Sequence, residues 1–353
     1  MTEAYRRDNR MNSFAYHLFI DAFPEGWMKT LMDVERNPKK AFFAYRDTLA
    51  PVLMNLRTDR FKLFAEETAK VECWVCNDTS GKLGGTEVHY QVFMNQRLLY
   101  AEKAGADIEP CASQFQGFIE FKVPDVKEKG ICRIQAALVN HCGNMINSTE
   151  LMLEVFPKVT AGVGNVCLIG GGDGRLDGWK ADMDWKDITL RDVKARDCIL
   201  VAEYDAFLRN EAEILQKAES GANLLFIELQ EGNYQIGGCS ILVKNCSMLP
   251  LHFASRDTGH SIVEGMGADA VRFWYDEEVG YITPLLEATF TAQGYQPILT
   301  SGNQDAEGNW QSVLAVGECA YGSGKIRICQ VKLPSRTRKN PTAKELARKL
   351  ISG

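Results

Sequence analysis

Hydrophobic and polar positions follow three different patterns along this chain, and each pattern predicts a different kind of structure. In residues 1–57, a nearly continuous apolar run at residues 15–20 ends at Asp21, and apolar side chains recur at helical spacing in residues 39–49. The run is typical of a strand buried on both faces, and the spacing predicts a helix. Because a lone parallel strand leaves its main-chain groups unbonded, the segment predicts one strand and one helix of a larger β/α assembly.

The second pattern, in residues 58–157, consists of short apolar or alternating runs separated by turn residues. It predicts seven strands, at residues 62–66, 69–77, 87–94, 97–102, 117–123, 131–140 and 148–156. About seven short strands in roughly 100 residues are typical of an immunoglobulin-like β-sandwich. We therefore expect an all-β domain here.

The third pattern, in residues 158–353, alternates short apolar runs with helical periodicity. Strands are predicted at residues 166–169, 197–202, 223–228, 312–316 and 325–333, and helices at residues 210–219 and 342–351. Pro341 precedes the last helix, as expected at a first helical turn. This order predicts an α/β domain with a parallel sheet and crossover helices.

Composition excludes several classes of function. The chain has 353 residues, a net charge of −6 and no long basic run, so we expect no nucleic-acid partner. It has no apolar segment of about 18 residues and no charged-then-apolar leader, so we expect no membrane association and a cytoplasmic location. Its 11 cysteines are an odd number scattered through strand-like segments, which favours reduced thiols.

Two motifs invite a metal or cofactor assignment but do not support one. Cys73 and Cys76 form a single C-x-x-C, and strand alternation places them on opposite faces. The glycine cluster at residues 170–174 lacks the G-x-G-x-x-G spacing of dinucleotide-binding loops. We therefore expect no metal and no cofactor.

The N-terminal segment carries a family resemblance. The stretch from His17 to Pro24, followed by Trp27 and an Arg-Asn-Pro-Lys segment at residues 36–39, resembles the end of the catalytic barrel in glycoside hydrolase family 2. That family includes β-galactosidases, β-glucuronidases and β-mannosidases. The matching residues are Asp21, Phe23, Pro24, Trp27 and Lys39. His17 stands where many members have Trp, and Asn37 departs from the usual Arg-Pro-Lys. The resemblance covers about the first 55 residues.

The resemblance implies that residues 1–57 are the last strand and helix of a (β/α)8 barrel and that the chain is a C-terminal piece. Such glycosidases use two carboxylates from earlier strands, one of them in an Asn-Glu pair. The pair Asn210-Glu211 opens a helix in another domain, so we expect no catalytic residue here. In a completed barrel Asp21, Phe23 and Trp27 would line the sugar site. Alternatively, Trp27 packs the loop and Asp21 caps it.

The other two segments extend the resemblance. A sandwich similar to the predicted one follows the barrel in many relatives of the family. Residues 158–353 resemble a flavodoxin-like, class I glutamine-amidotransferase-like domain, as found in accessory or oligomerisation modules of some β-galactosidase-type enzymes. The stretches that carry this resemblance are residues 252–260, 273–276, 321–325 and 330–333.

True amidotransferases place a nucleophilic cysteine on a sharp turn after a strand. Here residues 230–232, which follow the predicted strand, contain no cysteine, and Cys239 has glycines on one side only. A polar loop holds four further candidates, which either bind a ligand or fix the loop by internal hydrogen bonds. They are His252, Arg256, Asp257 and His260.

Three functions follow from these observations. The first is the non-catalytic C-terminal part of a glycoside hydrolase acting on β-linked sugars, with structural, assembly or substrate-positioning roles, carbohydrate as partner and a tendency to form homo-oligomers. The second is a stand-alone binding or scaffold protein. The third is a thiol-dependent hydrolase or amidotransferase that uses Cys239. Under the first, residues 1–57 of the isolated chain should be poorly packed.

Overall fold

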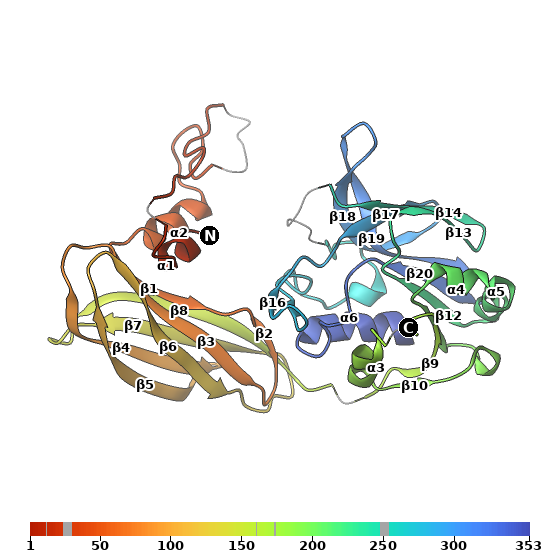
Figure 1. Ribbon diagram of the computed structural model, residues 1–353, viewed down its shortest axis with the longest axis horizontal. Helices are drawn as coiled ribbons and strands as arrows, with labels where there is room; N and C mark the ends of the chain where they lie inside the picture. The colour runs from red at the N-terminus through yellow and green to blue at the C-terminus, as the bar shows by residue number, and fades with distance from the viewer. Residues whose placement is uncertain (12, 24–29, 160, 173, 248–253) are drawn as a thin grey trace. The chain divides into compact units, whose positions relative to one another are not determined.

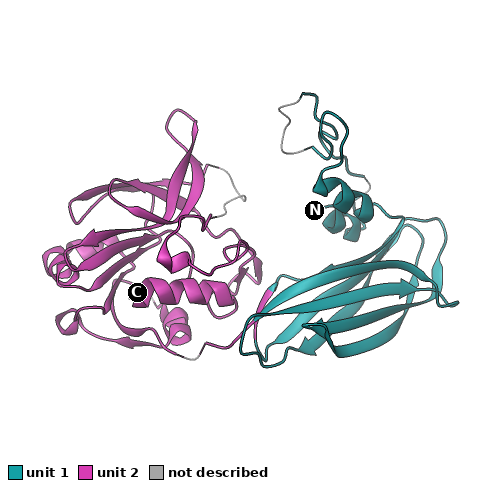
Figure 2. Ribbon diagram, turned by 180° about the vertical axis from the view of Figure 1, so that it is seen from behind, with its two compact units in different colours: residues 1–61, 65–155 teal, residues 62–64, 156–353 magenta. Residues whose placement is uncertain are grey.

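The chain folds into two compact units. The computed structural model describes residues 1–11, 13–23, 30–159, 161–172, 174–247 and 254–353. The first unit comprises residues 1–61 and 65–155, and the second comprises residues 62–64 and 156–353 (Figures 1 and 2). Among the described residues no helix is both long and apolar enough to cross a membrane.

The first unit contains a β-rich sandwich of antiparallel strands. One sheet has the order β1-β3-β6, from β1 (Val52–Arg57), β3 (Thr68–Asn77) and β6 (Ala112–Lys122). The other has the order β8-β7-β4-β5, from β4 (Leu83–Met94), β5 (Arg97–Ile108), β7 (Gly130–Val139) and β8 (Met145–Phe156). The short strand β2 (Lys62–Phe64) is grouped with the second unit.

Buried and partly exposed side chains alternate along several strands of the sandwich. Val71 and Val75 of β3 are fully buried, and so are Ile134 and Leu138 of β7. Alternate side chains of both strands reach solvent. The seven strands were predicted from short apolar or alternating runs separated by turn residues, and each prediction overlaps an observed strand. The prediction missed β1, in which four consecutive residues are buried and no alternation is visible.

The N-terminal segment contains two short helices, α1 (Thr2–Arg7) and α2 (Lys40–Thr48). The helix predicted over residues 39–49 is confirmed. The strand predicted over residues 15–20 is wrong, because the described part of this segment forms only single bridges, from Ile20 to Met32 and from Met32 to Pro38. An apolar run without a neighbouring strand has no ladder to join, and it stays irregular.

Buried polar contacts attach α1 to the rest of the first unit. Arg6 is 8% exposed and donates to the carbonyl oxygens of Thr48 and Ala50, each at 2.7 Å. The Ser113 hydroxyl donates to the Arg6 carbonyl oxygen, and Asn9 exchanges hydrogen bonds with the Ser113 main chain at 2.7 and 2.9 Å. The N-terminal helix is therefore held against β6, more than 100 residues away in sequence.

The second unit is built on a ten-stranded mixed sheet. Its order is β10-β9-β11-β12-β20-β19-β17-β14-β13, and β18 pairs with β19. Neighbouring strands from β10 to β20 are parallel, and those from β20 onward are antiparallel. The parallel strands are β9 (Gly164–Ile169), β10 (Trp185–Asp187), β11 (Cys198–Val201), β12 (Asn223–Ile227) and β20 (Gly324–Cys329). The antiparallel strands are β13 (Gly232–Ile236), β14 (Cys239–Asn245), β17 (Ala288–Ala292), β18 (Gln296–Gln304) and β19 (Trp310–Tyr321).

Helices cover both faces of the parallel strands. Leu225 and Ile227 of β12 belong to one core cluster, and Leu224 and Phe226 belong to another, so alternate residues of the same strand serve opposite faces. The first cluster includes residues of α3 (Asp177–Met183) and α6 (Pro341–Ser352), and the second includes residues of α4 (Tyr204–Leu208) and α5 (Glu211–Glu219).

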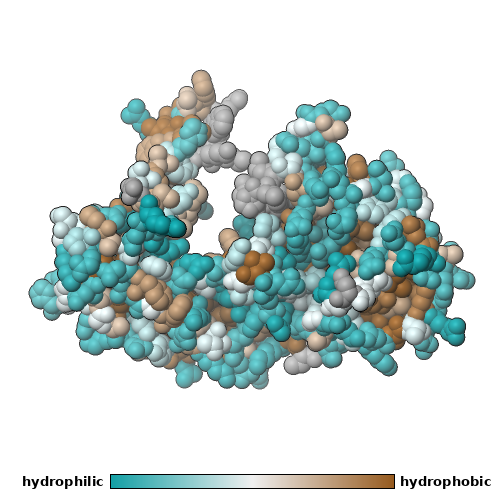
Figure 3. Space-filling view, viewed as in Figure 1, coloured by the Kyte–Doolittle hydropathy of each residue, from teal (hydrophilic) through white to brown (hydrophobic). Residues whose placement is uncertain are grey.

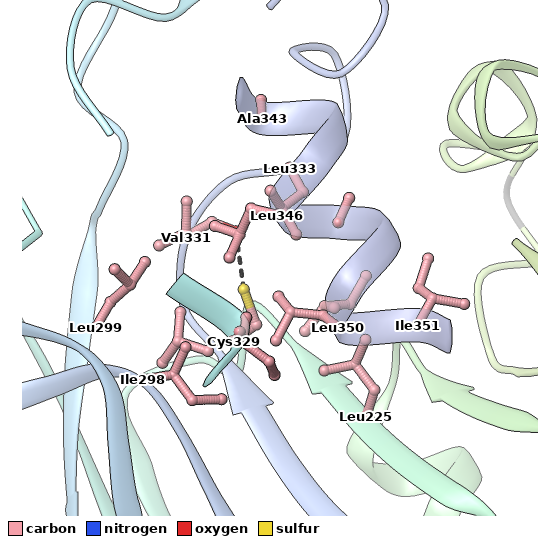
Figure 4. Close-up of a cluster of buried hydrophobic side chains, with 14 of the residues drawn as sticks. Leu225, Ile298, Leu299, Cys329, Val331, Leu333, Ala343, Leu346, Leu350 and Ile351 are labelled. Atoms are coloured by element: carbon pink, nitrogen blue, oxygen red, sulfur yellow. Dashed lines mark hydrogen bonds between the residues drawn. The ribbon is translucent and has the colours of Figure 1, made fainter. Parts of the chain in front are cut away.

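The terminal helix α6 buries its apolar side chains in the first of these clusters. Figure 4 shows Leu346, Leu350 and Ile351 of α6 beside Leu225 and Val331. Because β12 presents an uninterrupted apolar run, it can be buried from both sides, as the sequence predicted. The remaining elements are η1 (Leu190–Asp192), η2 (Ser261–Val263) and the small hairpin of β15 (Tyr275–Asp276) and β16 (Tyr281–Ile282).

The predicted parallel strands and the terminal helix are confirmed as β9, β11, β12, β20 and α6, although β20 ends at Cys329 and not at residue 333. The antiparallel half of the sheet is more extensive than predicted. Only residues 312–316, now part of β19, were foreseen. The chain as a whole is richer in strands than the alternation of strands and helices indicated.

Candidate functional site

The sugar-site candidates of the N-terminal segment are only partly brought together. Asp21 is 6% exposed, and its Oδ2 lies 2.7 Å from the Lys39 ammonium nitrogen. Its main-chain N–H donates to the Met32 carbonyl oxygen at 3.1 Å. Phe23 is 72% exposed, and Trp27 lies outside the described residues. Two residues of the family resemblance, 18 positions apart, therefore form an ion pair in which Asp21 is buried and Lys39 is partly exposed.

Exposed apolar side chains gather on the same segment. The helix α2 contains no buried residue. Brown, hydrophobic side chains are visible among the residues of this segment in Figure 3. The exposed set is Phe19, Ile20, Phe23, Val34, Phe43 and Leu49. So many apolar side chains on about 50 residues mark a surface suited to contact with another protein segment.

The polar loop candidates have different surroundings. His252 lies outside the described residues. Asp257 is exposed and Arg256 is half-buried, and within the described ranges neither contacts His260 through a hydrogen bond or ion pair. The His260 Nε2 lies 3.1 Å from Glu318 Oε1, and its Nδ1 accepts from the Ile262 N–H at 3.2 Å.

Glu318, which the sequence did not single out, is the centre of a charged cluster. It accepts from Lys325 Nζ and Arg327 Nε, each at 2.8 Å, and Arg327 also donates to the Leu350 carbonyl oxygen at 2.7 Å. Burial by itself would raise the pKa of Glu318. The hydrogen bonds from Lys325 and Arg327 outweigh it and hold the pKa at about 2. This cluster joins β19, β20 and α6.

A second polar cluster lies at the carboxyl ends of the parallel strands. A cavity of about 220 Å³ opens there, beside the end of β12. In open α/β sheets this edge is where ligands usually bind. The cavity's polar lining consists of Arg175, Glu228, Asp276, Glu278, Lys332, Ser335 and Arg336.

Glu228 directly follows β12 and has a strained backbone. Its φ is +49°, in the left-handed region that costs a non-glycine residue about 1 kcal/mol. The neighbouring Gln330 holds this turn: its side-chain amide accepts from the Leu229 N–H and donates to the Leu229 carbonyl oxygen, both at 2.8 Å. The Glu228 N–H donates to the Cys329 carbonyl oxygen at 2.9 Å. The turn is therefore fixed by contacts with the last residue of β20 and the residue that follows it.

The pKa values of two carboxyl groups in this cavity shift in opposite directions. Burial raises the pKa of Glu228, although Lys332 and Arg175 favour its charged form. Asp276 is buried as well, but Arg336 lies 2.9 Å away and, with nearby hydroxyl donors, holds the pKa of Asp276 below its ordinary value. Burial and the cationic neighbours thus act in opposite directions on Glu228, whereas at Asp276 the cationic and hydroxyl partners outweigh burial.

The glycine cluster after β9 has a local structural role. Gly170 has φ +81°, and a Cβ there would lie 2.6 Å from the Cβ of Glu203. The Gly171 N–H donates to Glu203 Oε1 at 2.7 Å. This loop therefore packs directly on Glu203, which precedes α4, and one of its amides is already bonded.

Sequence reasoning missed Glu228 because it counted this residue as the end of the strand predicted at residues 223–228 and searched residues 230–232 for a nucleophile. The available signal was an acidic residue directly after a wholly apolar run. Cys239, the alternative nucleophile, lies on β14 in the antiparallel part of the sheet and is half-buried. It is not among the residues that line the cavity beside Glu228.

The cysteines provide a direct chemical test of the thiol-dependent alternative. Cys111 and Cys142 are exposed, whereas burial raises the pKa of Cys73, Cys198 and Cys329 to about 12. We expect an Ellman titration of the folded chain to show a fast phase of two thiols, because reaction needs an accessible thiolate. The double variant Cys111→Ser/Cys142→Ser should lose this phase. A fast phase that persists and disappears in Cys239→Ser would instead indicate an activated thiol.

Comparison with known proteins gives partial similarities. No protein-family model matches the chain, and no curated protein matches it. The crystal structure of the exo-chitosanase CsxA of Amycolatopsis orientalis matches 43% of this chain and 17% of the enzyme, at 11% identity and a TM-score of 0.34. The CARDB domain of a Pyrococcus furiosus protein, solved with di-metal ions, matches 30% of this chain and 86% of that domain, at 17% identity and a TM-score of 0.21. The chain thus spans less than a fifth of the exo-chitosanase's length, and its similarity to this glycoside hydrolase is partial and of low identity.

Proposed function

We propose that this chain is the non-catalytic C-terminal part of a glycoside hydrolase acting on β-linked sugars, and that residues 1–57 complete a (β/α)8 barrel formed with residues outside this sequence. The observation that carries the proposal is the ion pair between Asp21 and Lys39. Both residues belong to the resemblance with glycoside hydrolase family 2. Their pairing supports the proposal because it brings two residues of the resembling stretch into direct contact.

The surface of the N-terminal segment supports the same proposal. Phe19 and Ile20 lie in the run that resembles a barrel strand, and they are 45% and 41% exposed. A complete barrel would place helices and strands against such side chains and supply the missing ladder. In this proposal Asp21 positions the loop through Lys39, while Phe23 and Trp27 face the bound sugar.

The strand order of the second unit supports an accessory role. If the parallel strands are numbered along the chain, their order β10-β9-β11-β12-β20 is 2-1-3-4-5, which is the flavodoxin-like order. In an amidotransferase-like domain the turn after the fourth strand would carry the nucleophile. That position holds Glu228 here, which favours assembly or substrate positioning over amide hydrolysis. In the sandwich, the sheets β1-β3-β6 and β8-β7-β4-β5 match the strand order of an immunoglobulin-like domain.

The decisive experiment is to read the coding sequence directly upstream of the Met1 codon and to express any open frame fused to this chain. The proposal expects barrel strands with an Asn-Glu pair and a second strand-end Glu, and hydrolysis of p-nitrophenyl β-glycosides by the restored protein. Asp21→Asn in that protein should lower activity, whereas Asp47→Asn, at an exposed position of α2, should not. A stop codon with no barrel coding upstream would overturn the proposal.

A stand-alone binding or scaffold protein is the second candidate. It is favoured by the second unit, which buries two core clusters of its own. An accessory domain with an assembly role should also form homo-oligomers, which light scattering of the isolated chain would detect. If the chain is monomeric and no barrel coding precedes it, the stand-alone function becomes the better one.

Amide exchange provides a separate test of the incomplete barrel. In the isolated chain we expect α2 to exchange its amide hydrogens much faster than β12 and β20. The reason is that α2 has no buried residue, whereas every residue of β12 is buried. Hydrogen-exchange mass spectrometry measures this difference. Strong protection of residues 14–50 in the isolated chain would show that this segment needs no further partner.

A further inference from the structure

The cavity beside Glu228 has a charge-balanced lining. Three side chains are cationic and three are carboxylic, namely Arg175, Lys332 and Arg336, and Glu228, Asp276 and Glu278. A cavity of about 220 Å³ is smaller than those that hold drug-sized ligands, which run from about 300 to 1,000 Å³. The lining therefore suits a small molecule without a net charge, because a charged ligand would disturb this balance.

Most of the charged groups around the cavity are already paired. Asp276 accepts from Arg336 and Thr283 at its Oδ2, each at 2.9 Å, and from Ser335 at its Oδ1, at 3.0 Å. Lys332 forms an ion pair with Glu287. In contrast, the half-buried Glu228 carboxyl group has no hydrogen bond and no ion pair within the described part of the chain. Its hydrogen-bonding capacity is turned toward the cavity.

The Glu228 turn has the features of a built site. A left-handed φ at a glutamate persists only where surrounding contacts fix it, and Gln330, which is 3% exposed, does so through two hydrogen bonds to Leu229. Such stored strain is typical of binding and catalytic positions. Arg336 also lines the cavity, and its side chain is only 3% exposed. Its Nε is buried and lacks a hydrogen-bond partner among the described residues.

The arrangement also selects the chemical group that fits. An ionised carboxylate only accepts hydrogen bonds, and ammonium and guanidinium groups only donate them. A ligand group that bridges the two must donate on one side and accept on the other, and a hydroxyl group does both. Neighbouring hydroxyl groups on one molecule would contact Glu228 and Lys332 together.

We propose that this cavity binds a neutral, hydroxyl-rich molecule of about the size of a monosaccharide, with Glu228 as the main acceptor of its hydroxyl groups. The site lies in the second unit, at the carboxyl ends of β12 and β20. It is independent of any barrel, and the proposal does not rest on the proposed glycosidase function. It gives the amidotransferase-like domain a ligand of its own.

The test uses the full chain and saturation-transfer difference NMR, with D-glucose, D-galactose and D-mannose as probes. We expect at least one of them to bind with a saturable signal and Glu228→Gln to weaken that binding about tenfold, because it removes a charge-assisted hydrogen bond. Glu307→Gln, at an exposed turn of the same unit, is the matched control and should bind as the unchanged chain does. Equal binding by the Glu228 variant would overturn the proposal.

A second variant separates binding from folding. Glu228→Gly removes the carboxyl group and also relieves the left-handed strain, so we expect it to lose sugar binding while its thermal midpoint rises. A purely structural glutamate would give the opposite change in midpoint. The proposal fails if the midpoint falls, if no neutral sugar binds the unchanged chain, or if D-glucuronate or inorganic phosphate binds more tightly than every neutral sugar.

Discussion

Replacing Glu318 by glutamine is expected to lower the free energy of unfolding of the second unit by about 3 kcal/mol at neutral pH. Glu318 lies 2.8 Å from Arg327, whose side chain is 1% exposed, and also contacts Lys325 and His260. Without the carboxylate, the Arg327 guanidinium remains buried and unneutralised. Removal of one partner from a buried ion pair is among the costliest single changes.

The pH dependence of stability distinguishes the loss of this ion pair from a change in the packing of neighbouring side chains. The pKa of Glu318 falls from an ordinary 4.5 to about 2 in the folded chain, which corresponds to about 3 kcal/mol. Because the folded-state pKa is the lower one, this stabilisation is fully present above about pH 4.5 and is lost as the pH falls toward 2. The difference between the unchanged chain and Glu318→Gln should therefore shrink across this window.

Urea unfolding, followed by tryptophan fluorescence at several pH values, measures both quantities. Glu307→Gln is the control, since its side chain is exposed, and surface changes of this kind usually stay within about 0.5 kcal/mol. A loss below about 1 kcal/mol at pH 7, or a loss that persists unchanged at pH 2, would contradict the assigned role of the Glu318 cluster.

Replacing Gly324 by alanine is expected to destabilise the second unit by about 3 kcal/mol or more. A Cβ at this position would lie 2.3 Å from the carbonyl oxygens of both Ala218 and Ala222. Both are main-chain atoms, at the end of α5 and at the start of β12, so neither can move aside as a flexible side chain would. Gly324 opens β20, and the strand could not keep its parallel pairing with β12.

Gly178→Ala is the matched control for this change. Gly178 lies in α3, and its Cβ would meet nothing within 4 Å. Alanine there should raise stability by about 0.5 to 1 kcal/mol, because glycine weakens a helix interior. Chemical unfolding of both variants gives the comparison. Similar midpoints for the two would show that the close approach at Gly324 is relieved at little cost.

Sequence patterns predicted those strands whose burial appears directly in the order of apolar and polar residues. β3 and β7 alternate, and β12 is an unbroken apolar run, so each was predicted correctly. β1 is buried along four consecutive residues, but the polar Asn55 interrupts its apolar run, so neither pattern was visible. The apolar run at residues 15–20 carries the same signal as β12, yet the described chain supplies no strand to pair with it. The pattern of apolar residues indicates that a segment can be buried, but it does not indicate whether a neighbouring strand is present to pair with it.

The cavity beside Glu228 was beyond the reach of sequence reasoning for a different reason. Its residues come from separate elements, with Glu228 after β12, Asp276 in β15 and Arg336 beyond β20. No local spacing connects them. A glutamate also gives no hint that its φ is +49°, because left-handed backbone is usually indicated by glycine or asparagine. Only the three-dimensional order of the parallel strands brings the three together.

The central pair of parallel strands has a consequence for the biosynthesis of the protein. β12 ends at Ile227 and pairs with β20, which begins at Gly324, so nearly 100 residues are synthesised between the two. Until β20 emerges from the ribosome, one edge of β12 is open, and one of its two apolar faces lacks the side chains of α6. Such an edge is prone to pair with other chains. Folding of the second unit therefore has to await a late part of translation, and the nascent chain is a natural client for chaperones during that interval.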